Sequence, residues 1–105
     1  MKLENIDMSI MEERAGRASA FLKGIASPHR LMILCQLVEG EKSVTELIEA
    51  TDIAQTSVSQ HLSKLRQEGL VTYRREHRTL YYRIDNPAVL NIMSVLYEEF
   101  CKEGE

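Results

Sequence analysis

Two thiols are the side chains of this sequence best suited to reversible chemistry, and they lie far apart along the chain. Cys35 stands within LMILCQLVEG, and Cys101 stands near the C-terminus within YEEFCKEGE. The N-terminal residues show no export signal, so we expect a cytoplasmic protein. Structural disulfides are rare in that compartment, where a thiol pair is more often reactive, metal-binding or part of the core. Which of these roles applies depends on where the secondary-structure elements place the two thiols.

The composition is that of one folded domain. The 105 residues are 44% hydrophobic and 28% charged, which excludes a disordered chain and leaves a modest core that a second subunit could extend. We therefore expect residues 1–105 to form a single domain. No apolar run approaches the roughly 18 residues of a membrane span, so no membrane partner is expected. The sequence has no nucleophile–base pair, phosphate loop or cofactor motif, so we expect neither an enzyme nor a bound cofactor.

The charge is unevenly distributed along the chain. The net charge is −3, but residues 55–83 carry six Lys or Arg and two Glu, a balance of +4. The rest of the chain carries seven basic and fourteen acidic side chains, a balance of −7. A basic segment within an acidic protein is typical of a nucleic-acid-binding surface.

The first part of the chain has helical periodicity. Between residues 8 and 25 the apolar side chains recur every three or four positions, which predicts a helix with a seam for a partner helix. The seam consists of Met8, Met11, Ala15, Ala18, Leu22 and Ile25. A second helix is predicted to begin at Ser27 and Pro28 and to close at Gly40 in a left-handed conformation. Cys35 lies on its apolar face and is predicted to be buried; the other members of that face are Leu31, Leu34 and Val38.

Two shorter helices are predicted next. Ser43 and Glu46 have the spacing of a capping box, which marks the start of a short helix. A turn at TDI leads into AQTSVSQHLSKLRQEG, which predicts a second helix that stops at Gly69. The inner face of this second helix consists of Val58, Leu62 and Leu65.

The apolar period then changes from helical to alternating. LVTYRR and TLYYRID predict two strands joined by a hairpin tip at EHR. The expected buried face of the hairpin consists of Val71, Tyr73, Leu80, Tyr82 and Ile84. A final helix is predicted from Asn86 and Pro87. Its apolar side chains, Val89, Met93, Leu96, Tyr97 and Phe100, end beside Cys101.

Two short helices joined by a tight turn and followed by a basic hairpin describe a winged helix-turn-helix. The second of these helices enters the major groove of DNA in that fold, and its side chains reach base edges and phosphates. The candidate DNA-binding residues on it are Gln55, Thr56, Ser57, Ser59, Gln60, His61 and Lys64. Arg74, Arg75 and Arg78 on the hairpin are candidates for contacts to the backbone or the minor groove.

Periodicity alone leaves a second interpretation open. A polar helix face and a charged hairpin also occur on protein-interaction modules that bind no operator. His61 by itself is as compatible with a packed, hydrogen-bonded histidine as with a DNA contact.

The segments ASPHRLMILCQL, VTELIEATDIAQTSVSQHLSKLRQEGLV and RREHRTLYYRI together resemble the ArsR/SmtB family of bacterial repressors. The resemblance covers roughly residues 15–100, and QTSVSQHLSKLRQEGLV is its most specific part. It implies a mainly α fold of five helices with a two-stranded wing. It also implies a homodimer through the first and last helices that binds a pseudo-palindromic double-stranded operator. Ala54 departs from the family, which often has a capping Ser there.

The family is best known for metal sensors, but two of its metal sites are not expected here. One uses a Cys-x-Cys pair on the first helix of the helix-turn-helix, where this chain has VTELIEAT and no sulfur. Another uses histidines and carboxylates on the last helix, where NPAVLNIMSVLYEEF has no histidine. Glu98 and Glu99 alone are a poor zinc site. We therefore expect no metal at either place.

A cysteine on the second helix and one on the last helix are similar to the persulfide-sensing branch of the family, the SqrR/BigR/HlyU-like proteins. By that resemblance Cys35 and Cys101 form an intrasubunit di- or polysulfide bridge with low-molecular-weight persulfides as inducer, and the bridge releases DNA. A pair set slightly too far apart for a direct disulfide would select sulfur over peroxide. The alternatives are a response to peroxide, disulfide stress or a thiophilic metal, an anti-repressor role, or two core cysteines.

Overall fold

The structure is a computed structural model that describes residues 7–102 of the chain, with the side chain of Cys101 outside the description. The described residues form five α-helices, one π-helical turn and a three-stranded sheet. The helices are α1 (Met8–Ile25), α2 (Pro28–Val38), α3 (Val44–Thr51), α4 (Gln55–Gln67), α5 (Pro87–Leu96) and the π-helix η2 (Tyr97–Cys101). The strands are β1 (Lys42–Ser43), β2 (Val71–Glu76) and β3 (Thr79–Ile84). Among these helices, none is long and apolar enough to cross a membrane.

Local sequence signals set most of the helix starts. The side chain of Ser27 accepts a hydrogen bond from the backbone N–H of Arg30, and Pro28 occupies the first turn of α2. The capping box at α3 is complete, because Ser43 and Glu46 each accept from the other's backbone N–H. Ala54 makes no side-chain cap for α4, as expected from its methyl group. The predicted starts of α2, α3 and α4 are therefore confirmed.

The core gathers around α2, which packs against α3, α4, α5 and β3. Val58, Leu62 and Leu65 form the inner face of α4 and are fully buried, as predicted. Cys35 is 8% exposed, which confirms its predicted burial. The buried face of α2 is wider than expected, because neighbours on several sides also cover Ile33 and Leu37.

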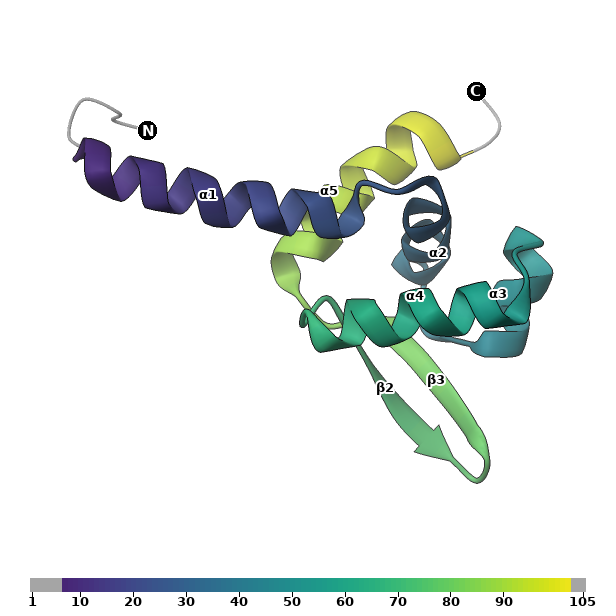
Figure 1. Ribbon diagram of the computed structural model, residues 1–105. Coiled ribbons are helices and arrows are strands. Elements are labelled where there is room, and N and C mark those ends of the chain that lie inside the picture. Colours follow the sequence, from purple (N-terminus) through teal and green to yellow (C-terminus); the bar gives the residue numbers. More distant parts are fainter. Residues whose placement is uncertain (1–6, 103–105) are drawn as a thin grey trace.

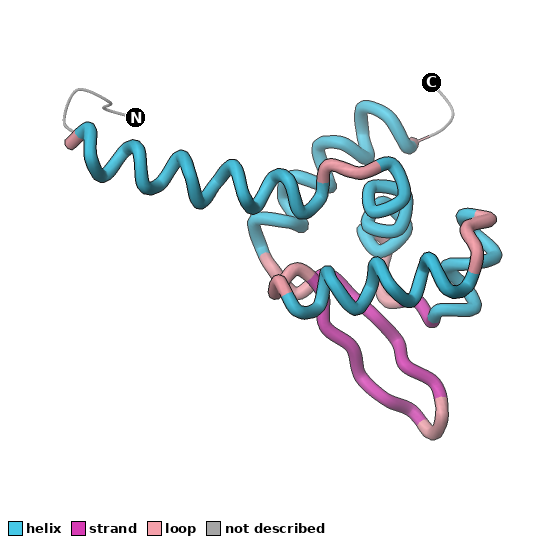
Figure 2. The backbone as a smooth tube through the Cα atoms, viewed as in Figure 1, coloured by secondary structure: helices cyan, strands magenta, loops and turns pink. Residues whose placement is uncertain are grey.

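The sheet is antiparallel with strand order β1-β3-β2. β2 and β3 form the predicted hairpin, paired from Val71 with Ile84 to Glu76 with Thr79. His77 has a φ of 59° at its tip. The sequence predicted two strands, and the third, β1, was missed because two residues carry no alternating pattern. Figure 2 shows the β2–β3 hairpin, the wing, extending away from the helices.

The first and last helices differ from the rest in how little of their apolar surface the chain itself covers. α1 extends out of the body of the molecule (Figure 1), and only Gly24 and Ile25 near its C-terminal end are buried. α5 buries Val89 and Met93 but passes into the π-helical turn, where Lys102 donates to the carbonyl of Tyr97. The wider turn changes the direction of the following side chains, and Phe100 is 79% exposed. Phe100 still lies beside Leu96 at an apolar hollow, so the predicted apolar face reaches it but is left largely uncovered by the chain itself.

Candidate nucleic-acid interface and thiol site

Most of the polar residues predicted to contact DNA lie on the exposed face of α4. This helix follows α3 after a tight turn in which Asp52 has a φ of 59°. Five of the candidate residues are exposed there, namely Gln55, Thr56, Ser59, Gln60 and Lys64. Their short amide and hydroxyl groups suit base edges and phosphates, and no acidic residue lies in the first turn of α4.

Ser57 and His61 face α2 and are only partly exposed. The Nδ1 atom of His61 lies 3.3 Å from Nε of Arg30, which donates to it. The Oγ atom of Ser57 lies 3.5 Å from Nδ1 of His29, and the two histidine rings stand edge to face at 5.8 Å. These two residues of α4 are thus occupied by contacts within the protein.

Burial is the main cause that lowers the pKa of His61 from its ordinary value of 6.5, and the nearby charges of Arg30 and His29 add to it. The neutral imidazole is the form that accepts a hydrogen bond at Nδ1. The hydrogen bond from Arg30 and the lowered pKa therefore both favour the neutral form of His61.

The three wing arginines have different surroundings. Arg74 forms ion pairs with Glu41 at 2.6 Å and Glu76 at 3.0 Å and lies over the ring of Tyr81 at 4.7 Å. Its hydrogen bond to Glu41 raises the pKa of Arg74 and lowers that of the Glu41 carboxyl. The charge of Arg74 is thus balanced within the chain. Arg75 is exposed and enters no ion pair with any residue that the structure describes.

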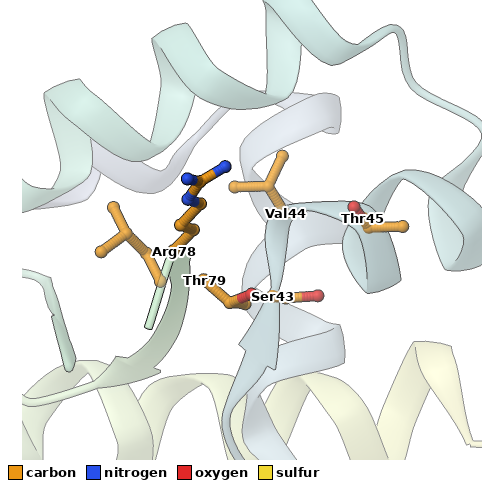
Figure 3. A pocket seen from close by; sticks show the side chains of 6 residues that line it. Ser43, Val44, Thr45, Arg78 and Thr79 are labelled. Atoms are coloured by element: carbon orange, nitrogen blue, oxygen red, sulfur yellow. The ribbon is translucent and has the colours of Figure 1, made fainter. Parts of the chain in front are cut away.

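Arg78 occupies the turn of the wing, where a hollow of about 270 Å³ separates the wing from the start of α3. Figure 3 shows its side chain beside Val44, with Ser43 and Thr45 on the α3 side and Thr79 on the wing side. Arg78 is exposed, and no carboxylate within the described part of the chain pairs with it. Its guanidinium group is therefore available to a phosphate.

The thiol site centres on α2 and the last turn of the chain. Cys35 is buried, is disulfide-bonded and lines an apolar hollow of about 310 Å³ together with Leu31, Leu96 and Phe100. The second cysteine of the sequence, Cys101, ends η2 in the backbone, and its side chain lies outside the described residues. The hydroxyl of Tyr97, the first residue of η2, donates to Glu39 at the end of α2 at 2.6 Å. The backbone that carries Cys101 is thereby held near the helix that carries Cys35.

Metal-binding side chains do not gather in the described region. It contains no group of three or more His, Cys, Asp or Glu that could hold a metal ion. His29 and His61 are close to each other, but the Nδ1 atom of His29 faces Ser57 and that of His61 faces Arg30. His77 lies apart from them at the tip of the wing.

A tight helix-turn-helix with a polar outer face, followed by a basic wing, defines a winged-helix DNA-binding protein. The family model described as "Bacterial regulatory protein, arsR family" matches residues 27–73, from the start of α2 to the wing. The chain belongs to this family of DNA-binding transcription regulators.

Relatives of known name agree with this assignment along almost the whole chain. The biofilm growth-associated repressor of Agrobacterium fabrum is 38% identical over 105 residues, which cover 100% of this chain and 90% of the relative. The crystal structure of the repressor BigR from Xylella fastidiosa has a TM-score of 0.84 at 38% identity, covering 93% and 100% of the two chains. Reduced HlyU from Vibrio cholerae has a TM-score of 0.82 at 37% identity, covering 88% and 97%. These relatives are named as transcription regulators, and the chain resembles the same branch that its two cysteines suggested.

The sequence alone did not reveal three residues that shape these sites. Arg30 and Glu41 meet partners 31 and 33 positions away in the chain, and Tyr97 meets one 58 positions away. No local pattern signals such pairings, because they depend on how the helices pack. The basic character of the wing could be predicted from the sequence, whereas the ion pairs of Arg74 with Glu41 and Glu76 could not.

Proposed function

We propose that this protein is a transcriptional repressor that binds its operator as a homodimer and is released when reactive sulfur species oxidise Cys35 and Cys101. The observation that carries the proposal is the disulfide at Cys35, because the chain has one other cysteine and α2 packs against η2, which ends in it. We propose Cys101 as the bridging partner. Operator DNA as the ligand implies a cytoplasmic protein.

The exposed face of α4 supports the proposed reading of DNA. Gln60 and Ser59 offer amide and hydroxyl groups toward base edges, and Lys64 offers a cation toward the backbone. Arg75 and Arg78 supply phosphate contacts that do not depend on sequence. Arg74 contributes differently, since its ion pairs hold the wing against the loop before β1.

The uncovered apolar surface supports a homodimer through α1 and α5. Large apolar side chains on both helices are exposed in the single chain, namely Met8, Ile10, Leu22, Leu90 and Val95. An 18-residue helix with two buried residues gains little from its own chain and needs another surface to pack against. A second copy offers the same two helices and places two α4 helices for the two halves of a pseudo-palindrome.

The proposed sulfur chemistry balances without a further oxidant. One thiolate attacks the outer sulfur of a persulfide RSSH, becomes a cysteine persulfide and releases RSH. The second thiolate then attacks the protein sulfur and releases H₂S, leaving a disulfide. If both cysteines are first persulfidated, the outer sulfur of one persulfide attacks the inner sulfur of the other. This step leaves a trisulfide bridge and releases H₂S. The donor is reduced by the electrons that leave the two thiols.

The surroundings of Cys35 bear on selectivity. A direct disulfide at Cys35 is sterically allowed, so extra sulfur atoms are not required to span a gap. We therefore propose that selection occurs in the first attack and not in the reach of the bridge. The apolar hollow formed with Leu31, Leu96 and Phe100 suits a small, uncharged sulfur donor better than a hydrated ion.

A bridge between α2 and η2 would act on the dimer. It ties the end of the proposed dimer helix to the core of its own subunit and so alters the spacing or the mobility of the two α4 helices. A coupling of about 1–3 kcal/mol would reduce DNA affinity roughly 5–150-fold.

The names of the relatives favour one alternative as well. One relative is named a repressor and another, from Vibrio cholerae, a transcriptional activator at 34% identity over 95% of this chain. An anti-repressor role therefore stands beside repression. Peroxide, disulfide stress or a thiophilic metal at the cysteines would keep the DNA interface and change only the inducer.

Intact mass measurement tests the proposed inducer. The reduced protein is treated with a persulfide donor or with hydrogen peroxide, and free thiols are alkylated. We expect the donor sample to resist alkylation at both cysteines and to include species with added sulfur. The Cys35→Ser and Cys101→Ser variants serve as controls and should form no intrasubunit bridge. Two alkylated thiols after donor treatment would refute the proposal, and bridging by peroxide alone would favour the peroxide alternative.

A further inference from the structure

One arginine connects three helices beside the DNA-reading surface. Arg30, near the start of α2, donates through Nη1 to the carbonyl of Gly24 in α1 at 2.7 Å. Its Nε donates to His61 in the middle of α4 at 3.3 Å. Nη1 also lies 3.8 Å from Glu68, which follows the last turn of α4. The side chain of Arg30 is only 16% exposed, whereas that of Glu68 is 45% exposed. The contacts of Arg30 with Gly24 and His61 are therefore better shielded from water than its contact with Glu68.

Gly24 leaves the room that this arrangement needs. A Cβ atom at position 24 would lie 2.7 Å from Oε1 of Glu68, so the end of that 45% exposed side chain would have to move away from Arg30. The C-terminal end of α1, the N-terminal end of α2 and the C-terminal end of α4 thus meet around the guanidinium group of Arg30.

The position of α4 depends on few other polar contacts. Its N-cap, Ala54, makes no side-chain hydrogen bond, and the residues that pack its inner face are apolar and non-directional. Arg30 and the Ser57–His29 pair are the polar side-chain contacts between α2 and α4 in the described structure. A rigid, planar guanidinium group with several donors fixes direction as well as distance.

We propose that Arg30 is a positioning residue for DNA recognition, and that His61 serves as its anchor on α4 and does not read DNA. The clamp, defined here as Arg30 with Gly24, His61 and Glu68, sets the angle at which the exposed face of α4 meets the major groove. Sequence-specific contacts need that angle, whereas phosphate contacts from the exposed wing residues Arg75 and Arg78 do not. Loss of the clamp therefore lowers specificity more than it lowers general DNA affinity.

The test compares two DNA probes at one salt concentration. One probe is a duplex selected from random-sequence DNA by repeated binding to the wild-type protein, and the other is a shuffled duplex of equal length and composition. The variants are Arg30→Gln, which removes the charge and the fork, and Arg30→Lys, which keeps the charge and cannot make all three contacts. Arg17→Gln, an exposed arginine on α1, is the matched control.

We expect Arg30→Gln to lose about tenfold in affinity for the selected duplex and little for the shuffled one, since a hydrogen bond to a charged group is lost. Arg30→Lys should lie between it and the wild type. A protein that had merely become less stable would lose the same factor on both probes. An unchanged ratio between the probes in folded Arg30→Gln or Arg30→Lys would overturn the proposal.

A double substitution separates the anchor role of His61 from direct DNA contact. If both residues act through one clamp, Arg30→Gln combined with His61→Leu loses no more than Arg30→Gln alone, which already removes the contact with His61. Independent contributions that add would show that His61 contacts DNA by itself and would overturn its assignment as anchor. NMR titration of His61 provides a readout in the free protein, because removal of Arg30 should raise the pKa of His61 toward 6.5.

Discussion

α4 and α1 both carry an apolar face, but the chain buries that of α4 and leaves most of that of α1 exposed. α4 buries Val58, Leu62 and Leu65 completely and presents a polar face to solvent. α1 is longer but buries two residues, and Leu22 on its seam is 49% exposed. The comparison indicates two interfaces with different chemistry. The core holds α4 with its polar face outward, while α1 leaves apolar surface uncovered, as the proposed homodimer requires.

The largest effect is expected from a charge on the α1 seam. Leu22→Glu places a carboxylate in the proposed dimer interface, so we expect a monomer by sedimentation. A monomer loses the linkage of two half-site contacts, so DNA affinity should fall roughly 10²–10⁴-fold. Arg17→Asp, which adds an acid to an exposed position of α1 off the seam, should remain dimeric. A dimeric Leu22→Glu with normal affinity would remove α1 from the interface.

A cavity behind α4 should affect stability instead of assembly. Leu62 is fully buried, so Leu62→Ala should reduce the free energy of unfolding by about 2–5 kcal/mol in urea titrations. Gln60 lies on the exposed face of the same helix, so Gln60→Ala should change the free energy of unfolding by less than about 0.5 kcal/mol. Equal losses from both variants would mean that the two faces of α4 are not distinct.

The exposed face of α4 and the wing should differ in what they contribute to binding. Gln60→Ala should relax base preference at one operator position, worth about 1–3 kcal/mol of discrimination. Arg78→Gln should weaken binding to all sequences alike and reduce the magnitude of the salt slope by about 0.9. Affinities on a panel of single-base variants, measured at several salt concentrations, separate the two. Identical effects of Gln60→Ala and Arg78→Gln on all sequences and at all salt concentrations would show that the two residues do not play different roles.

The smallest expected effect is the pH dependence that comes from His61. Its folded-state pKa is lowered, mainly by burial, so the unfolded chain takes up a proton at a higher pH than the folded one. The contribution of neutral His61 to the free energy of unfolding is fully present above the ordinary pKa of 6.5. It falls as the pH decreases from 6.5 through the folded-state pKa. Urea unfolding at about pH 7.5 and about pH 5 should show a smaller loss in His61→Asn than in the wild type. His77→Asn at the exposed wing tip is the control, and a loss as large in His61→Asn as in the wild type would contradict the account.

The sequence predicted those features that depend on neighbours in the chain. Caps such as Ser27 and the Ser43–Glu46 box, and the burial of Cys35, follow from spacing over a few residues. β1 was missed because its two residues become a strand only by pairing with Tyr81 and Tyr82 of β3. Likewise, nothing in YEEFC distinguishes a π-helical turn from the α-helix before it.

The candidate DNA interface was predictable as a set and not residue by residue. Exposed Gln55, Thr56, Ser59 and Gln60 follow from helical periodicity once the inner face is known. The contacts of His61 and Arg74 required the packed structure, because their partners come from α2 and from the loop before β1. Ion pairs and buried hydrogen bonds between distant segments leave no periodic trace in a sequence.

The proposed coupling between the two thiols and the DNA interface can be tested directly in one binding experiment. The affinity of the reduced protein for a duplex selected by the wild type is measured at fixed salt before and after treatment with a persulfide donor, for the wild type and for Cys35→Ser. We expect the wild type to lose affinity roughly 5–150-fold and to recover it on reduction, while Cys35→Ser stays bound. Equal release of Cys35→Ser, or full affinity in wild-type protein whose two thiols are bridged, would contradict the account.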